Sequence, residues 1–173
     1  MSVLLDAAQA QKSGRTVITV DIAEMAVVAD PALILVTYSL GSCVGVSVFD
    51  PEAGVGGLIH CMLPLSRIDP RKAADRPAMF VDTGLPALLQ AVYDLGANRR
   101  NLQLKAAGGG APLGPDEVFK IGQRNLEVLG KVLWKNGLEL RAQCVGGSQA
   151  RTLALDLQSG RTVVRTDGKE SEL

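Results

Sequence analysis

Short runs of Val, Ile and Leu, broken by turn residues, fill the chain from Thr16 to Pro64. Two turns stand out in this region, "DP" at Asp30 and "DPEAG" at Asp50–Gly54. Aliphatic and β-branched runs bounded by such turns are typical of strands. The pattern therefore predicts that the first part of the chain is rich in β-strands.

Apolar residues recur at helical spacing in two later segments. The first is "DTGLPALLQAVYDLGA" over residues 82–97, where Asp82 or Thr83 can act as N-cap and Gly96 can end the helix. The second is "IGQRNLEVLGKVLWKNGLEL", which begins at Ile121 and whose helix ends at the "NG" of Asn136. Strand-like runs begin at Leu102, Leu138, Arg151 and Arg161.

Strands and helices are mixed within 173 residues, a length that suits one hydrophobic core. We expect an α/β fold (an α+β sandwich) in which helices pack on a mostly antiparallel β-sheet. This single domain is expected over residues 16–166. Residues 1–15 are expected to form a flexible N-terminal segment, and the polar residues 167–173 a frayed C-terminal tail.

Composition argues against several functional classes. Lys plus Arg and Asp plus Glu both number 18, so no net charge attracts nucleic acid or an anionic membrane. The N-terminal residues lack the pattern of a signal peptide, and no run approaches the ~20 apolar residues of a membrane span. Three cysteines, an odd number, argue against a disulfide framework. We therefore expect a soluble, cytoplasmic protein.

The stretch "LGSCVGV" places Cys43 at the start of a predicted hairpin strand. If the hairpin turns near residue 52, residues whose numbers sum to about 103 to 105 lie opposite one another. Cys43 and His60, the only histidine, sum to 103. This register predicts that the thiol and the imidazole are neighbours on one face of the sheet.

An imidazole beside a thiol can accept its proton and so create a nucleophile. The alternative is a buried Cys43 and a His60 bonded to the backbone, since free cysteines are often inert core residues. Gly41 and Ser42 favour the reactive interpretation, because the N–H groups of a tight turn can stabilise an oxyanion. The segment does not fit a nucleophile elbow, because "VGVSVF" continues as a strand and not as a helix.

Other potential ligands and loops leave alternatives open. The possible zinc ligands are Cys43, His60, Cys61 and Cys144. Adjacent residues of one strand point to opposite faces, so we expect no metal site, and Cys61 and Cys144 are expected in the core. The loops "AAGGGAPLG" and "VGGS" match no nucleotide-binding motif. Their backbone is expected to pass close to a substrate or to a neighbouring strand. The candidate substrate-loop residues are Gly41, Gly108, Gly109, Gly146 and Gly147.

Six motifs, in order, resemble the CheD family of chemoreceptor glutamine deamidases: "LGSCVGV", "GGLIHCMLP", "FVDTGLPALLQ", "GANRRNLQLKAAGGG", "IGQRNLEVL" and "CVGGSQART". The resemblance extends from about Asp21 to Thr166. It implies a fold similar to the deamidase domain of cytotoxic necrotizing factor. It also implies an enzyme that converts glutamines of methyl-accepting chemotaxis receptors to glutamates, and we expect no cofactor. On this resemblance the nucleophile is Cys43, the histidine is His60 and the third catalytic residue is Thr37.

Each of these roles is chemically reasonable. Cys43 would attack the carboxamide carbon, His60 would shuttle protons, and Thr37 would orient the imidazole through its hydroxyl or its carbonyl. The backbone N–H groups of Ser42 and Cys43 are candidates for an oxyanion hole. The sequence departs from the family's pattern at Cys61 and in "GGGAPL". Two alternatives stay open: a module that binds a CheC-type phosphatase of the response regulator CheY, and an esterase acting on receptor methyl-glutamates.

Overall fold

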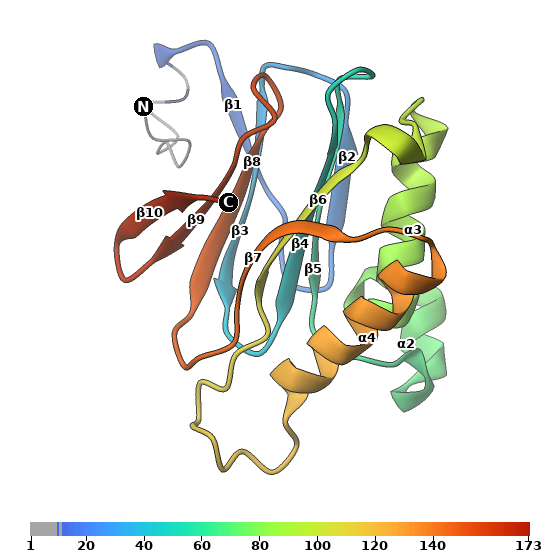
Figure 1. The fold of residues 1–173 in the computed structure, drawn as a ribbon, viewed down its shortest axis with the longest axis vertical. Helices are drawn as coiled ribbons and strands as arrows, with labels where there is room; N and C mark the ends of the chain where they lie inside the picture. The colour runs from blue at the N-terminus through green and yellow to red at the C-terminus, as the bar shows by residue number, and fades with distance from the viewer. Residues whose placement is uncertain (1–9, 11) are drawn as a thin grey trace.

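The computed structural model describes residue 10 and residues 12–173, which form two five-stranded β-sheets and three α-helices (Figure 1). The strand order is β1-β3-β8-β9-β10 in the first sheet and β2-β5-β4-β6-β7 in the second. The strands are β1 (Thr16–Thr19), β2 (Met25–Val28), β3 (Leu33–Leu40), β4 (Val44–Asp50), β5 (Val55–Cys61), β6 (Gln103–Gly108), β7 (Leu140–Val145), β8 (Arg151–Asp156), β9 (Thr162–Thr166) and β10 (Lys169–Glu172). The helices are α2 (Pro70–Asp75), α3 (Val81–Asp94) and α4 (Ile121–Lys135).

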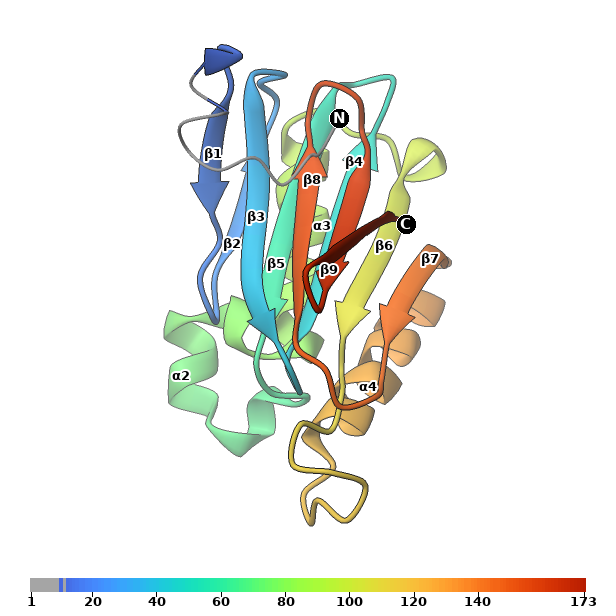
Figure 2. The same cartoon turned by 90° about the vertical axis from the view of Figure 1, so that its left-hand side faces the viewer.

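The elements are arranged in three layers, as the two views of Figures 1 and 2 show. Helices α3 and α4 cover one face of the second sheet, and the first sheet packs on its other face. The core on the helix side includes Ile59 and Leu85, and the core between the sheets includes Leu35 and Leu58. Strands β4 and β5 are therefore buried along their whole length.

Both sheets are mixed. β1 pairs with β3 in parallel and β6 pairs with β7 in parallel, whereas the other pairings between the described strands are antiparallel. The predicted α/β class and the mainly antiparallel pairing are confirmed. The division of the strands into two sheets was not predicted, because alternation along a strand does not identify its pairing partner.

The β4–β5 hairpin turns where the sequence predicted. Asp50 pairs with Val55 across the turn. The Asp50 carboxylate accepts hydrogen bonds from the N–H groups of Glu52 at 2.9 Å and Ala53 at 3.0 Å. An acidic side chain that caps the backbone in this way is a common means of fixing a turn.

The register of this hairpin places Gly45, and not Cys43, directly opposite His60. Paired residues sum to 105, the upper limit of the predicted range. Cys43 precedes the first residue of β4 and lies two residues before Gly45, so its side chain is a diagonal neighbour of His60 on the same face. The predicted pairing of Cys43 with His60 was therefore wrong by two residues, whereas the prediction that both lie on the same face of the sheet is correct.

Helix α3 begins at Val81 with Phe80 as its N-cap, so the predicted caps Asp82 and Thr83 were wrong. The Asp82 carboxylate instead accepts hydrogen bonds at 2.8 Å from the N–H and the hydroxyl of Ser66. A contact with a distant segment has therefore replaced the local cap that the sequence suggested.

Helix α4 confirms the second predicted helix. Its buried residues include Leu129, Val132 and Leu133, which form the apolar stripe that faces the second sheet and α3. No helix in the described part of the chain is long and apolar enough to cross a membrane.

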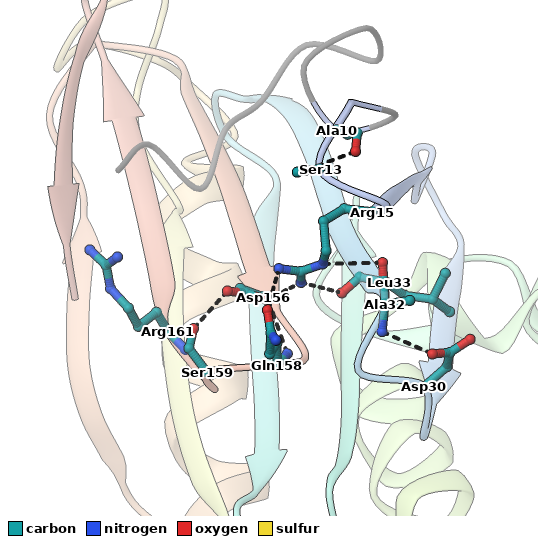
Figure 3. Close-up of polar contacts among 10 residues, drawn as sticks. All are labelled: Ala10, Ser13, Arg15, Asp30, Ala32, Leu33, Asp156, Gln158, Ser159 and Arg161. Atoms are coloured by element: carbon teal, nitrogen blue, oxygen red, sulfur yellow. Dashed lines mark hydrogen bonds and ion pairs between the residues drawn. The ribbon is translucent and has the colours of Figure 1, made fainter.

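The C-terminal end differs from the expected frayed tail. Residues Lys169–Glu172 form β10, which pairs with β9 although all four residues are exposed. The expected N-terminal segment, residues 1–15, lies largely outside the described residues. Its last residue, Arg15, pairs with the Asp156 carboxylate and donates hydrogen bonds to the carbonyls of Ala32 and Leu33 (Figure 3).

Candidate active site

The segments that carry the candidate residues meet at the end of the sandwich where β3 turns into β4, the lower end in Figure 1. There the turn between β3 and β4, residues Gly41–Cys43 and hereafter the Cys43 loop, meets the end of β5 and the segments that follow β6 and β7. The Gly109 N–H donates to the Cys43 carbonyl at 2.8 Å, and the Gly146 N–H donates to the Gly108 carbonyl at 2.9 Å. Backbone hydrogen bonds thus hold this end of the molecule together.

A short hydrogen bond joins Thr37 of the first sheet to His60 of the second. The Thr37 hydroxyl lies 2.7 Å from His60 Nδ1, and both side chains are fully buried. The same hydroxyl lies 2.7 Å from the Val20 carbonyl, to which it donates its proton. The hydroxyl of Thr37, and not its carbonyl, is therefore the group that contacts the imidazole.

This arrangement assigns the protonation state of His60. A hydroxyl that donates to a carbonyl can only accept from the imidazole, so the Nδ1 atom carries the proton. Burial lowers the pKa of His60 to about 4, although the Asp21 carboxylate raises it in part. At neutral pH the ring is uncharged, and its Nε2 lone pair is buried without a partner among the described residues. This nitrogen is therefore available as a hydrogen-bond acceptor, although burial makes it a weaker base than a free imidazole.

Cys43 lies next to the core between the two sheets and is partly exposed. Burial raises the pKa of its thiol, and the hydrogen bond from the backbone N–H of the same residue lowers the pKa by less. Because the described part of the chain supplies no partner for His60 Nε2, the thiol and the imidazole are not hydrogen-bonded here. The resting pair is a neutral thiol near a neutral imidazole.

Glycines allow the Cys43 loop and the end of β6 to come into contact. Gly108 has a φ of +99°, and a Cβ there would lie 2.2 Å from the Cys43 carbonyl oxygen. The Gly110 N–H donates to the Gly41 carbonyl at 2.8 Å. For Gly41, Gly108 and Gly109, the close neighbour is therefore another segment of the same chain.

A pocket of about 400 Å³ opens beside this contact. Gly109, Gly146 and Gly147 line it, and so do Glu117 and Leu126. Glu117 Oε2 is buried without a hydrogen-bond partner among the described residues. Because the Gly109 N–H also donates to the Cys43 carbonyl, the pocket is adjacent to the Cys43 loop.

The other two cysteines lie outside this arrangement. Cys61 is fully buried on the helix side of the second sheet, and burial raises the pKa of its thiol far above the usual range. Cys144 is only partly buried, contrary to the expectation of a core residue, and accepts a hydrogen bond from Arg151 Nε at 3.2 Å. No group of three His, Cys, Asp or Glu side chains that could hold a metal ion occurs in the part of the chain that the structure describes.

Asn125 is a polar residue of this site that the sequence analysis did not identify. It is fully buried in α4, and its Nδ2 donates to the Ser42 carbonyl at 2.9 Å and to the Met62 carbonyl at 3.2 Å. A signal was present in the sequence. Asn125 lies one helical turn from both Ile121 and Leu129, so it interrupts the apolar stripe with an amide.

Comparison with known proteins identifies the family of this chain. A model of the family described as CheD chemotactic sensory transduction matches residues 62–166. A protein of Solibacter usitatus, named probable chemoreceptor glutamine deamidase CheD, is 47% identical over 156 residues, which cover 90% of this chain and 92% of that protein. This chain belongs to the CheD family.

Further CheD relatives align over most of their own length. One from Syntrophus aciditrophicus is 43% identical over 135 residues, which cover 78% of this chain and 84% of the relative. Another from Anaeromyxobacter dehalogenans is 39% identical over 158 residues, covering 91% and 99%. Both are named probable chemoreceptor glutamine deamidases. The match to the CheD family model begins at Met62, so it does not cover Thr37, Cys43 or His60.

Proposed function

We propose that this member of the CheD family is a chemoreceptor glutamine deamidase in which Cys43 is the nucleophile, His60 the base and Thr37 the residue that orients the base. One observation carries the assignment of roles. The hydrogen bond of Thr37 to His60 Nδ1 leaves Nε2 unprotonated and unpartnered among the described residues, at the end of the sandwich that holds Cys43. Hydrolysis by a cysteine nucleophile requires such an imidazole nitrogen near an accessible thiol.

The reaction proceeds through a thioester. The Cys43 thiol gives its proton to His60 Nε2, and the sulfur attacks the carboxamide carbon of the substrate glutamine. The imidazolium then donates that proton to the departing nitrogen, the C–N bond breaks and ammonia leaves. Water, deprotonated by the now neutral His60, attacks the thioester. The C–S bond breaks, the glutamate product leaves, and the imidazolium returns its proton to the Cys43 sulfur, which restores the thiol and the neutral imidazole.

The neutral resting state suits this sequence of proton transfers. Burial raises the Cys43 pKa and lowers that of His60, so charge separation in the free enzyme is unfavourable. The proton moves only as the sulfur attacks, when a rotation of the Cys43 side chain brings it to Nε2. The backbone N–H groups of Ser42 and Cys43 are the donors proposed for the oxyanion.

The surroundings of the site suit a protein substrate. Large apolar side chains are exposed in β3, directly after β5 and in the loop before α4, three segments that reach this end of the sandwich. These are Tyr38, Met62, Leu113, Val118 and Phe119. Phe119 is 72% exposed and lies in the same loop as Glu117, which lines the pocket. We propose that the cytoplasmic helical part of a chemoreceptor binds here, with a side chain that flanks the target glutamine in the pocket. The fold similarity to cytotoxic necrotizing factor and a CheC-type partner stay predictions.

Mass spectrometry of a chemoreceptor cytoplasmic fragment tests the proposal. Co-expression with the wild-type chain should add about 1 Da for each converted glutamine, because –NH2 is replaced by –OH. Cys43→Ala should abolish the shift. Cys144→Ser, which alters a thiol outside the proposed site, should retain it.

Two results would contradict the assignment. Receptor glutamines that remain unchanged with the wild-type chain would exclude the deamidase function, and conversion by Cys43→Ala would exclude the thioester route. A parallel fragment that carries methyl-glutamate distinguishes an esterase, because the same thioester would form with loss of methanol.

A further inference from the structure

Asn125 connects helix α4 to two segments of the site through a single amide group. Its Nδ2 donates to the carbonyls of Ser42 and Met62, at 2.9 and 3.2 Å. Ser42 directly precedes the proposed nucleophile, and Met62 lies two residues after His60. One NH2 group therefore links the loop that carries the proposed nucleophile to the residue that directly follows β5, the strand of the proposed base.

The bond to Ser42 controls the direction of another group. The Ser42 carbonyl and the Cys43 N–H belong to one planar trans peptide, in which the two groups point in opposite directions. Asn125 holds the oxygen toward α4, so the N–H points to the opposite side of the peptide, and its hydrogen bond to the thiol lowers the Cys43 pKa in part. In the proposed reaction the oxyanion forms on the oxygen of the carboxamide whose carbon this sulfur attacks. The orientation of a proposed oxyanion donor thus depends on Asn125.

All three carbonyls of the Cys43 loop are held, but by different kinds of donor. The Gly41 and Cys43 carbonyls accept from the N–H groups of Gly110 and Gly109, both at 2.8 Å. Of the three, the Ser42 carbonyl is the one held by a side chain. Its support can therefore be removed by a substitution that leaves the backbone donors in place.

Packing alone does not account for an asparagine at this position. Asn125 Oδ1 is buried without a partner among the described residues, which is unfavourable for folding. A leucine would continue the apolar stripe between Ile121 and Leu129 without burying an unpaired oxygen. We propose that Asn125 is a positioning residue that aims the Cys43 N–H at the oxyanion and fixes the Cys43 loop relative to His60. This inference rests on the deamidase function proposed above.

The kinetic test compares Asn125→Leu with Leu129→Ala. The second variant removes buried apolar contacts one turn away and leaves both hydrogen bonds in place. Asn125→Leu should lower kcat on a receptor fragment by about 10- to 100-fold with little change in KM, because misplacement affects mainly the transition state. Leu129→Ala, assayed well below its melting temperature, should retain the wild-type kcat. Equal kcat values for the two folded variants would overturn the proposal.

Thiol reactivity gives a second readout that does not depend on receptor deamidation. In a Cys144→Ser background, the rate of Cys43 alkylation by iodoacetamide is followed against pH. Asn125→Leu should move the midpoint to higher pH, because the thiolate loses an oriented N–H donor. The same midpoint in Asn125→Leu and Leu129→Ala would refute the positioning role. Failure of the wild-type chain to convert receptor glutamines would refute only the deamidase function, because the alkylation comparison still tests Asn125.

Discussion

The two ends of the β4–β5 hairpin each bury an ionisable side chain completely, Asp50 at the turn and His60 at the open end. Asp50 Oδ1 accepts from the N–H groups of Glu52 and Ala53, and Oδ2 accepts from the Asn98 N–H at 2.7 Å. His60 uses Nδ1 and leaves Nε2 unpartnered among the described residues. One side chain has its hydrogen-bonding capacity filled, and the other keeps one position open.

Their pKa values express the same difference. Burial would raise the pKa of Asp50, but the hydrogen bonds from the N–H groups of Asn98, Ala53 and Glu52 outweigh it and hold the pKa below its usual value. For His60, burial dominates and lowers the pKa to about 4. A buried group that is fully hydrogen-bonded stabilises the fold, whereas one with an open position is available for chemistry.

The largest effect is expected from substitution of His60, whose Nε2 has no partner among the described residues. His60→Gln should lower deamidase activity by roughly 10³-fold, because an amide cannot accept the thiol proton. Gln retains polar atoms that can reach Thr37, so thermal unfolding should change little. Activity against a receptor fragment and a melting curve measure the two quantities. A variant that loses its fold together with its activity would make His60 a structural residue like Asp50.

Substitution of Asp50 should have the opposite effect, a loss of stability without a loss of activity. Asp50→Ala leaves three backbone N–H groups without their acceptor and should lower the free energy of unfolding by about 3 kcal/mol. Activity per folded molecule should stay at the wild-type level, because the turn lies at the far end of the hairpin. Urea denaturation gives the first value and kcat at low temperature the second. A selective loss of kcat would mean that the two ends are coupled.

The pH dependence of stability separates the two side chains further. The unfolded chain protonates His60 near pH 6.5 and the folded chain only near pH 4, so stability is complete above pH 6.5 and is lost as the pH falls toward 4. The shift corresponds to about 3 kcal/mol over this window. His60→Gln should flatten the fall in melting temperature between these pH values. The same slope in both proteins would show that His60 does not control it.

The sequence predicted the parts of the molecule that depend on local patterns. The hairpin, helix α4 and the shared face of Cys43 and His60 follow from periodicity and from turn chemistry. The exact register does not, because a four-residue turn over 51–54 and the start of β4 at Val44 move Cys43 to a diagonal position. The resemblance to CheD named Thr37, but only the meeting of two sheets shows which of its groups contacts the imidazole.

Tertiary contacts account for what the sequence did not predict. Asp82 has the appearance of a helix cap, but its carboxylate binds Ser66. The polar residues 169–172 resemble a frayed end, yet β9 supplies a partner strand that needs no apolar side chain. Asn125 is one amide in an apolar stripe, and its role depends on carbonyls of residues 83 and 63 positions away.

The bond between Thr37 and His60 has a consequence for folding. Each residue belongs to a different sheet, so neither sheet alone can form the pair, however complete its own ladder is. Recovery of activity during refolding would therefore follow the docking of the sheets and not the formation of secondary structure. An intermediate with native circular dichroism and separated sheets would be inactive, and the enzyme's own turnover would serve as the probe of that last step.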